Sequence, residues 1–403
     1  MRAAVKATLF QVHSIAGLVL SLVLTLIGVT GAVMSFEDEI LAGLNADLMH
    51  VEPRSTPLLS PDELLAQVKA ASDGSIAAIT LSRDPAAAVR IRFARNEDRS
   101  RPAALIVDPY DGRILGRPVG EGFFETVRKL HRWLLLPGDG KGYGRTITGI
   151  AALGLIAMLI SGLVLRWPHR PGSVKIWLKP NLRLHGRGLH RSLHSVVGTW
   201  VMLIYLVMVL TGLWWSFEWY KDSATWLFAR PPAIAEAPKA KPTKQLTKAE
   251  APNDKVAPAS REGAGAAPAP KLDLAWASLL QDRGDGFALV RLTLPSGGEP
   301  TIRVRAWLTD AADGRHDDFK IDAATGAIVS RTLHADKTLG EQMLARILDI
   351  HRGSILGWPG KLLFMLAALA MPLFAVTGLL LYVSRRRHQR MTRAAMTRLV
   401  PGE

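Results

Sequence analysis

Residues 13–37 read HSIAGLVLSLVLTLIGVTGAVMSFE, and residues 194–218 read HSVVGTWVMLIYLVMVLTGLWWSFE. The second stretch repeats the first at a constant offset of 181 residues (194 − 13). The positions that recur in register are His13-Ser14, Gly17, Thr30-Gly31 and Ser35-Phe36-Glu37. Apolar helices resemble one another by composition alone, but shared polar residues and glycines at both ends of a segment indicate an internal duplication. Each copy is apolar for about 20 residues, the length that crosses the hydrocarbon core of a bilayer.

The composition is that of an integral membrane protein with additional water-exposed segments. The chain has 403 residues, of which 48% are hydrophobic, and its mean hydropathy is positive. The formal net charge of +15 does not indicate a nucleic-acid partner, because basic residues concentrate in the loop 168–193 and in the tail 385–403. Lys and Arg beside apolar spans mark the cytoplasmic side of a membrane, so both segments are predicted to lie there.

Four membrane spans are predicted. They lie at roughly 13–36, 145–166, 195–217 and 361–383. An even number of spans returns both termini to the cytoplasm, in agreement with Arg2 and Lys6 near the N-terminus. The first span is too long for a signal peptide and lacks a small-residue cleavage site, so it is predicted to remain as an anchor.

Two segments between the spans are predicted to fold outside the membrane, each as one helix on a small antiparallel sheet. The first segment has a helix from Ser60 to about Ala71 and strands near 76–82, 88–94, 103–107 and 113–117. The second has a helix near 272–281 and strands near 288–294, 301–308 and 318–321. The turns Asp108–Gly112 and Asp322–Gly326 occupy matching places, so the duplication covers a helix, a domain and a second helix. Residues 229–270 are rich in Ala, Pro and Lys and are predicted to form a disordered linker.

The predicted fold class is therefore an α-helical membrane protein with four transmembrane helices, two parallel helix–domain–helix repeats and two small α+β domains on the outer side. The predicted segments are 1–37 (N-terminus and first span), 38–125 (first outer domain), 126–167 (outer interfacial helix and second span), 168–193 (basic cytoplasmic loop), 194–219 (third span), 220–270 (outer segment with the linker), 271–338 (second outer domain), 339–384 (outer interfacial helix and fourth span) and 385–403 (basic cytoplasmic tail).

Four histidines repeat with the spans and form two predicted pairs. His13 and His194 open the first and third spans on the cytoplasmic side and form the inner pair. His131 and His351, each followed by Arg, precede the second and fourth spans and form the outer pair. A single histidine at a membrane surface is as well explained by contact with lipid headgroups. Repetition in register favours ligation of a shared cofactor.

Two histidines at each side of the membrane suit axial ligation of haem iron, so the pattern predicts two haem b groups. The absence of cysteine excludes c-type attachment, thiolate-ligated clusters and cysteine-zinc sites. Zinc on two histidines without nearby carboxylates would be incompletely ligated. His190, one helical turn before His194, is an alternative inner ligand or a hydrogen-bonding partner of a haem propionate. Four glycines are predicted to let a flat macrocycle lie against the helices or to serve helix packing; they are Gly17, Gly31, Gly198 and Gly212.

The duplicated histidine-bearing spans, Leu130-His131-Arg132, the His190–His194 segment and the Asp-x-x-x-Gly turns together resemble the PepSY-associated transmembrane helix family of iron-regulated membrane proteins. The resemblance covers nearly the whole chain apart from the linker. It implies PepSY-like periplasmic domains and a haem protein of the inner membrane of Gram-negative bacteria, which in some members reduces ferric siderophores. Some relatives carry a fused flavin reductase module. This chain ends about 20 residues after its last predicted span, so a separate electron donor is expected.

Two functions are consistent with these features. In the first, the protein is a ferric-chelate reductase, and electrons from quinol or a cytoplasmic donor pass through the inner and then the outer haem to a periplasmic ferric siderophore or other ferric chelate. In the second, the PepSY-like domains bind a periplasmic protein or peptide, and the spans are only an anchor. Membrane lipid is a partner in both. The colour of the purified protein distinguishes them, because only the first requires haem.

Overall fold

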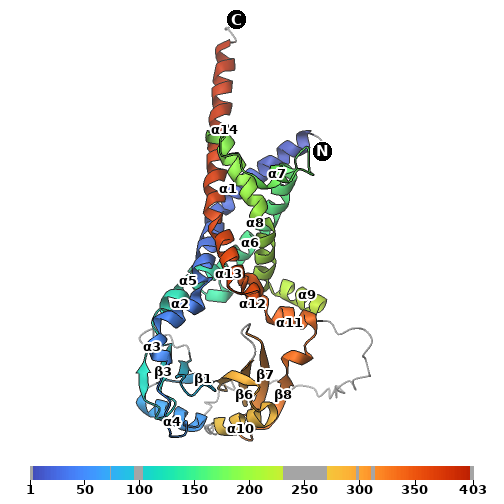
Figure 1. The fold of residues 1–403 in the computed structure, drawn as a ribbon. Helices are drawn as coiled ribbons and strands as arrows, with labels where there is room; N and C mark the ends of the chain where they lie inside the picture. The colour runs from blue at the N-terminus through green and yellow to red at the C-terminus, as the bar shows by residue number, and fades with distance from the viewer. Residues whose placement is uncertain are drawn as a thin grey trace, which may run out of the picture. The chain divides into compact units, whose positions relative to one another are not determined.

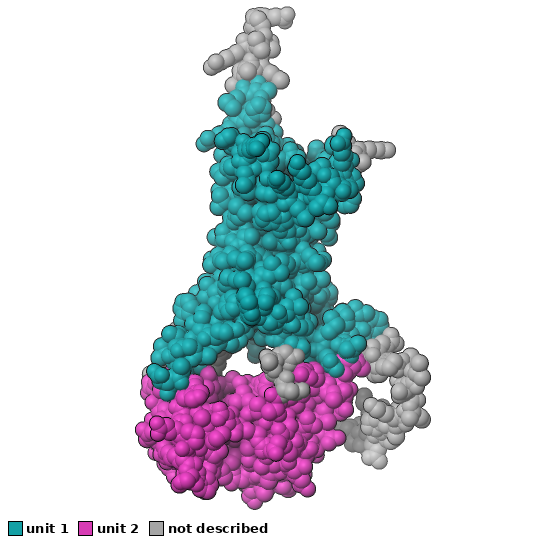
Figure 2. Space-filling view, viewed as in Figure 1, with its two compact units in different colours: residues 1–47, 118–228, 339–403 teal, residues 48–117, 229–338 magenta. Residues whose placement is uncertain are grey.

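A computed structural model describes residues 3–72, 74–94, 103–229, 270–295, 299–309 and 314–399. The chain folds into two units, which are coloured separately in Figure 2. The helical unit comprises residues 1–47, 118–228 and 339–403, and the sheet unit comprises residues 48–117 and 229–338. Each unit therefore combines segments from both halves of the duplication.

Four long apolar helices form the helical unit, and each is long enough to cross a membrane, which confirms the four predicted spans. They are α1 (Ala3–Met34), α6 (Tyr143–Arg166), α8 (Gly186–Ser216) and a fourth span in two parts, α13 (Gly357–Leu369) and α14 (Met371–Leu399). The fourth span is interrupted at Ala370, two residues before Pro372, because proline has no N–H to donate and excludes the preceding turn from regular helix.

The long helices run side by side in one bundle (Figure 1). Both α1 and α8 pack against α6 and α14, so the two copies of the duplicated helix occupy opposite corners. The bundle core includes Leu24, Ala151 and Tyr205, and the Tyr205 hydroxyl donates a hydrogen bond of 2.7 Å to the carbonyl of Ala367. This bond satisfies a buried hydroxyl that would otherwise be costly inside a bilayer.

Shorter helices flank the bundle. They are α2 (Glu37–Leu44), α5 (Glu121–Trp133), α7 (Val174–Leu178), α9 (Glu218–Phe228), α11 (Leu339–Ala345) and α12 (Ile347–Arg352), with 3-10 turns at Asp139–Lys141 and Ser354–Leu356. Helix α3 (Ala46–Met49) crosses the boundary between the two units in the sequence. Helix α5 packs against α1, and α12 packs against α8. Each copy of the duplicated helix thus has a short helix against it, and these short helices contain His131 and His351.

The sheet unit contains eight antiparallel strands in the order β4-β3-β2-β1-β5-β6-β7-β8. The strands are β1 (Ile76–Ser82), β2 (Val89–Phe93), β3 (Ala104–Val107), β4 (Ile114–Gly116), β5 (Phe287–Thr293), β6 (Thr301–Leu308), β7 (His316–Asp322) and β8 (Ile328–Thr332). Both predicted α+β segments are present, and they share one sheet because β1 pairs with β5, a pairing that the sequence did not predict. Strand β8 was not predicted either.

Two helices of the sheet unit, α4 (Pro61–Ala71) and α10 (Leu272–Arg283), contribute to a single core with the strands; Leu64 and Leu279 are fully buried in it. Each helix caps the other. The Asp62 carboxylate accepts hydrogen bonds from the backbone N–H groups of Leu272 (2.8 Å) and Asp273 (3.2 Å). The Asp273 carboxylate accepts from the N–H of Asp62 at 2.9 Å. Carboxylates stabilise helix N-termini because the first N–H groups have no partner within the helix.

The predicted helices and strands of the sheet unit agree with the observed elements to within a few residues at each end. The predicted linker, residues 229–270, lies almost entirely outside the described residues.

Candidate metal centres

The short helices that contain His131 and His351 are fixed to the bundle by close backbone contacts. A Cβ atom on Gly144 would lie 2.0 Å from the carbonyl oxygen of Trp133, and one on Gly360 would lie 2.2 Å from the carbonyl oxygen of Gly353. Only glycine permits such an approach. The Thr148 hydroxyl lies 3.0 Å from the carbonyl oxygen of Arg132. Glycines near the start of the second and fourth spans therefore hold the end of each histidine-bearing helix.

This arrangement brings the outer pair together. The ring centres of His131 and His351 are 6.5 Å apart, with an angle of 73° between the ring planes. Neither ring is stacked on the other. Each ring is instead held from its Nδ1 side by a long helix.

All four histidines of the predicted pairs are held in the same way, by a hydroxyl residue followed by glycine. We call Thr30-Gly31, Ser161-Gly162, Thr211-Gly212 and Thr377-Gly378 the hydroxyl–glycine dipeptides. The Nδ1-to-hydroxyl distances are 3.0 Å for His131 and Thr30, 2.7 Å for His13 and Ser161, 2.8 Å for His351 and Thr211, and 2.8 Å for His194 and Thr377. A Cβ on the following glycine would lie between 3.2 Å (Gly31) and 3.8 Å (Gly378) from the Cε1 atom of the same ring.

The hydroxyl groups determine which ring nitrogen carries the proton. Each hydroxyl has one proton, and each lies within hydrogen-bond distance of the carbonyl four residues earlier in its own helix, as Ser161 does with Ala157 at 2.7 Å. With that proton used, the hydroxyl oxygen accepts a hydrogen bond from the histidine, so Nδ1 is the donor. For His131 the carbonyl of Ile27, at 2.9 Å from Nδ1, requires the same assignment. Nε2 is then left with a free lone pair, the arrangement found in metal-binding histidines.

Burial keeps the outer rings neutral. It lowers the pKa of His131 to about 4 and that of His351 to about 3. Hydrogen bonds to the backbone of Ile27 and Met208 oppose these shifts, and the neighbouring Arg132 and Arg352 charges add to them. At neutral pH both Nε2 atoms are therefore unprotonated, as ligation of a metal requires.

The outer rings are close enough for both to contact one bound group. Their centres are 6.5 Å apart, and His131 and His351 are the residues that would hold a metal ion there.

The inner pair has the same local structure at the other end of the bundle. His13 on α1 and His194 on α8 each contact a hydroxyl–glycine dipeptide of a neighbouring span, and the His194 ring is 5.3 Å from the ring of Phe374. Thr30 follows His13 by 17 residues on the same helix (30 − 13). At 1.5 Å per residue, the two histidine pairs are about 25 Å apart along the bundle.

The donor set favours haem over zinc. Within the described ranges, no three His, Asp or Glu side chains come together in a way that could bind a metal ion. A two-histidine site is incomplete for zinc. It suits an iron whose other four ligands come from a macrocycle. The residues present therefore fit haem.

An acidic group lies beside the outer pair. Glu37 is buried and forms ion pairs with Arg128 of α5 and, at 3.2 Å, with Arg352 of α12. Asp38 pairs with Arg352 at 3.2 Å, and Glu39 pairs with Lys361. This acidic triplet neutralises basic residues from both halves of the chain.

The four predicted glycines all lie against side chains. Gly31 and Gly212 face the edges of the His131 and His351 rings, and Gly17 and Gly198 face Met158 and Phe374, as helix packing requires. His190 is partly exposed one turn before His194, and its role as an alternative ligand or as a propionate partner stays a prediction. The hydroxyl–glycine dipeptides were visible in the sequence as repeats, but their partners were not predicted.

A family model described as the PepSY-associated TM region matches residues 10–385. This match confirms the resemblance drawn from the sequence. No curated protein matches the chain.

Proposed function

The chain belongs to the PepSY-associated TM family, and we propose that it is a membrane electron-transfer protein that holds two haem b groups and reduces a ferric chelate. The observation that carries this proposal is the common structure around His13, His131, His194 and His351. In all four, a hydroxyl–glycine dipeptide engages Nδ1 and leaves Nε2 free. Helix packing alone does not require the same hydroxyl-to-Nδ1 hydrogen bond at four separate histidines.

When bound, haem iron supplies one-electron transfer between its ferric and ferrous states. The residues of this chain do the rest. Thr30 and Thr211 orient the outer rings and raise their basicity. Ser161 and Thr377 do the same for the inner rings. The apolar helices exclude water from both sites, and Glu37 balances the charges of Arg128 and Arg352 beside the outer site.

The orientation of the chain across the membrane follows from the distribution of its basic residues. With the basic segments 168–193 and 385–403 in the cytoplasm, the outer pair lies at the periplasmic surface of an inner membrane. A quinol in the membrane, or a separate cytoplasmic donor, supplies the electrons. Each quinol releases two electrons and two protons and so reduces two ferric ions to ferrous ions. Ferrous iron is held less tightly by oxygen ligands, so the reduction releases it from its chelate.

The test uses protein in liposomes with a reduced quinol and external ferric citrate, and measures ferrous iron with a ferrous-specific chromogenic chelator. We expect ferrous iron to appear with the wild-type chain and with His50→Ala, an exposed histidine of the sheet unit. We expect His351→Ala to lose the activity. Wild-type rates in His351→Ala would contradict the proposal.

One observation favours a binding role as a second candidate. The edge strand β8 is exposed along its whole length. An exposed edge offers unpaired N–H and C=O groups to which an extended peptide can add as a further strand. A colourless protein that binds periplasmic peptides through β8 would support this role over electron transfer.

A further inference from the structure

The two copies of the duplicated helix end differently. The first copy ends in Ser35-Phe36-Glu37-Asp38-Glu39, and the second ends in Ser216-Phe217-Glu218-Trp219-Tyr220. Two of the three acidic residues are thus replaced by aromatic ones. In the first copy, the acidic triplet pairs with Arg128, Arg352 and Lys361. In the second copy, Glu218 is the one carboxylate left to pair with the basic residues.

The basic residues around the second copy are not matched by acids. Arg145 lies at the place that Lys361 has in the other half, and it forms an ion pair with Glu218 at 2.7 Å. Arg132 follows His131 as Arg352 follows His351, but it has no acidic partner among the described residues. Its guanidinium lies over the ring of Trp133, 5.1 Å from the ring centre.

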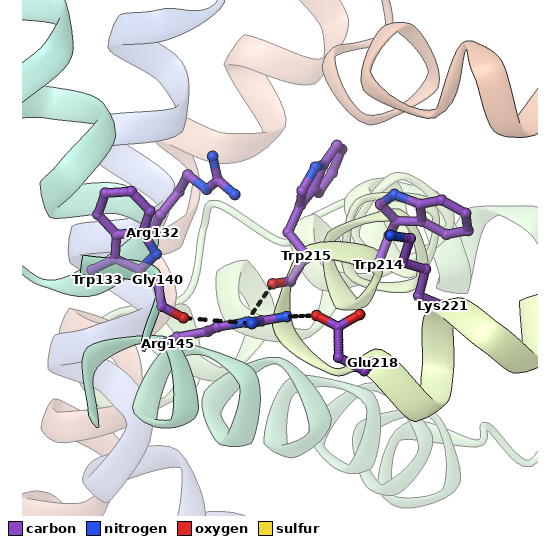
Figure 3. A pocket seen from close by; sticks show the side chains of 8 residues that line it. All are labelled: Arg132, Trp133, Gly140, Arg145, Trp214, Trp215, Glu218 and Lys221. Carbon is purple, nitrogen blue, oxygen red and sulfur yellow. Dashed lines mark hydrogen bonds and ion pairs between the residues drawn. The ribbon is translucent and has the colours of Figure 1, made fainter. Parts of the chain in front are cut away.

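A pocket of about 280 Å³ lies at these residues (Figure 3). Its lining residues are Arg132, Trp133, Gly140, Arg145, Trp214, Trp215, Glu218 and Lys221. Three cations therefore face one carboxylate. Figure 3 shows Arg145 bound to Gly140, Trp215 and Glu218, whereas Arg132 and Lys221 make no hydrogen bond or ion pair with the other residues drawn.

The pocket is next to the outer histidines. Trp215 lines it and also lies 5.6 Å, ring centre to ring centre, from His351. Trp214 and Trp133 add further flat apolar surface. A cationic pocket attracts anions, and its guanidinium groups favour carboxylates because they bind them in a planar, two-point manner.

We propose that this pocket binds the anionic, carboxylate-bearing part of the ferric chelate beside Trp215. That the bound metal is ferric iron rests on the proposed function. That the chelator is anionic rests on the positive charge of the pocket. It specifies an anionic chelate as the substrate class and excludes cationic ones from this site. Haem propionates carry the same carboxylate chemistry, so the test must separate the two sources.

The probe is gallium(III) citrate, which has the charge of an anionic ferric chelate but cannot be reduced under these conditions. Equilibrium dialysis with radioactive gallium measures its dissociation constant for the detergent-solubilised protein, and the haem content is measured on the same samples. The variants are Arg132→Gln, which removes the unmatched cation, and Trp219→Asp, which restores the acid present in the first copy. The control is Arg187→Gln, an exposed arginine at the opposite end of α8.

We expect both variants to raise the dissociation constant at least tenfold, with unchanged haem content, and the control to have no effect. Binding should also weaken as salt is added. Equal affinity in the variants, or no binding to wild type, would overturn the proposal. Loss of haem or a shifted Soret band in Arg132→Gln would overturn the proposal, because it would mean that Arg132 binds a haem propionate and not the chelate. A colourless wild-type protein that still binds gallium citrate through Arg132 would refute electron transfer but leave the pocket assignment standing.

Discussion

The rings of His131 and His351 lie 6.5 Å apart, although 220 positions separate them in the chain (351 − 131). They come from α5 and α12, which belong to different halves of the duplication and pack against different long helices. The His131 and His351 rings therefore approach each other where the two halves of the duplication meet. A metal ion held there would link the halves in the same way that Glu37 links Arg128 and Arg352.

The Thr30 hydroxyl should matter for cofactor affinity. Thr30→Val keeps the shape of the side chain but removes the oxygen that accepts from His131 Nδ1. Loss of such a contact typically lowers metal affinity by about 10- to 100-fold. We expect Thr30→Val to lose haem more readily on dilution or competition with apomyoglobin, and Thr30→Ser to behave like wild type. Identical haem release from both variants would show that the hydroxyl does not orient the ring.

Gly31 should be intolerant of a side chain. A Cβ there would lie 3.2 Å from His131 Cε1, and the ring would have to move. Haem content at the outer site should fall in Gly31→Ala, as judged by a lower haem-to-protein ratio. Gly43→Ala is the matched control, since it adds the same methyl group to a helix where nothing lies within 4 Å. Equal haem loss in both would point to a general effect of helix substitution.

Much of the fold follows from local patterns. Features that depend on neighbouring residues were predicted correctly. They are the four membrane spans, the start of a helix at Ser60 and the strands β1 and β6. Helix ends were less predictable, because α1 and α8 continue through polar residues beyond the apolar stretch. The β1–β5 pairing was not predicted, since it joins strands more than 200 residues apart and depends on the packing of both halves.

The sequence predicted which histidines repeat as pairs but not the contacts that each histidine makes. Repetition of His13 and His131 at His194 and His351 pointed to a shared role. The dipeptides Thr30-Gly31 and Ser161-Gly162 were also visible as repeats, but a sequence does not show which histidine each one faces. The cationic pocket was not predicted. The sequence shows that Trp219 and Tyr220 replace Asp38 and Glu39, but it does not show the ion pairs that Asp38 and Glu39 make with Arg352 and Lys361.

Cofactor-free protein should lose stability on acidification. The pKa values of His131 and His351 are about 4 and about 3 in the folded chain and near 6.5 when unfolded. Below pH 6.5 the unfolded chain binds protons that the folded chain does not, so stability falls as pH drops from 6.5 towards 4. Between pH 7 and pH 5 the loss is roughly 2 kcal/mol per histidine.

Thermal unfolding at pH 7 and pH 5, followed by tryptophan fluorescence, measures this loss. The control is the double variant His131→Asn, His351→Asn, in which the part of the pH dependence due to these residues should vanish. A pH dependence that is the same in wild type and double variant would mean that other groups cause it.

Glu37 should be essential for the packing of the helical unit. Glu37→Gln removes the buried carboxylate, so Arg128 loses its ion pair and Arg352 keeps only Asp38. Because both arginines are partly exposed, the cost should be about 1.5–3 kcal/mol, the usual worth of hydrogen bonds to charged groups. Glu125→Gln removes one half of a partly exposed pair with Lys129, four residues along the same helix, and should cost less than about 1 kcal/mol. Thermal unfolding in one detergent compares the two. Similar melting temperatures for both variants would show that the ion pairs of Glu37 do not stabilise the helical unit.

The central claim is that each histidine pair holds one haem, and the haem-to-chain ratio from a pyridine haemochrome assay tests it most directly. We expect two haems per chain in wild type and in His190→Ala, and one in His131→Ala, His351→Ala, His13→Ala and His194→Ala. A wild-type protein without haem, or a ratio of two that persists in both His131→Ala and His351→Ala, would contradict the account.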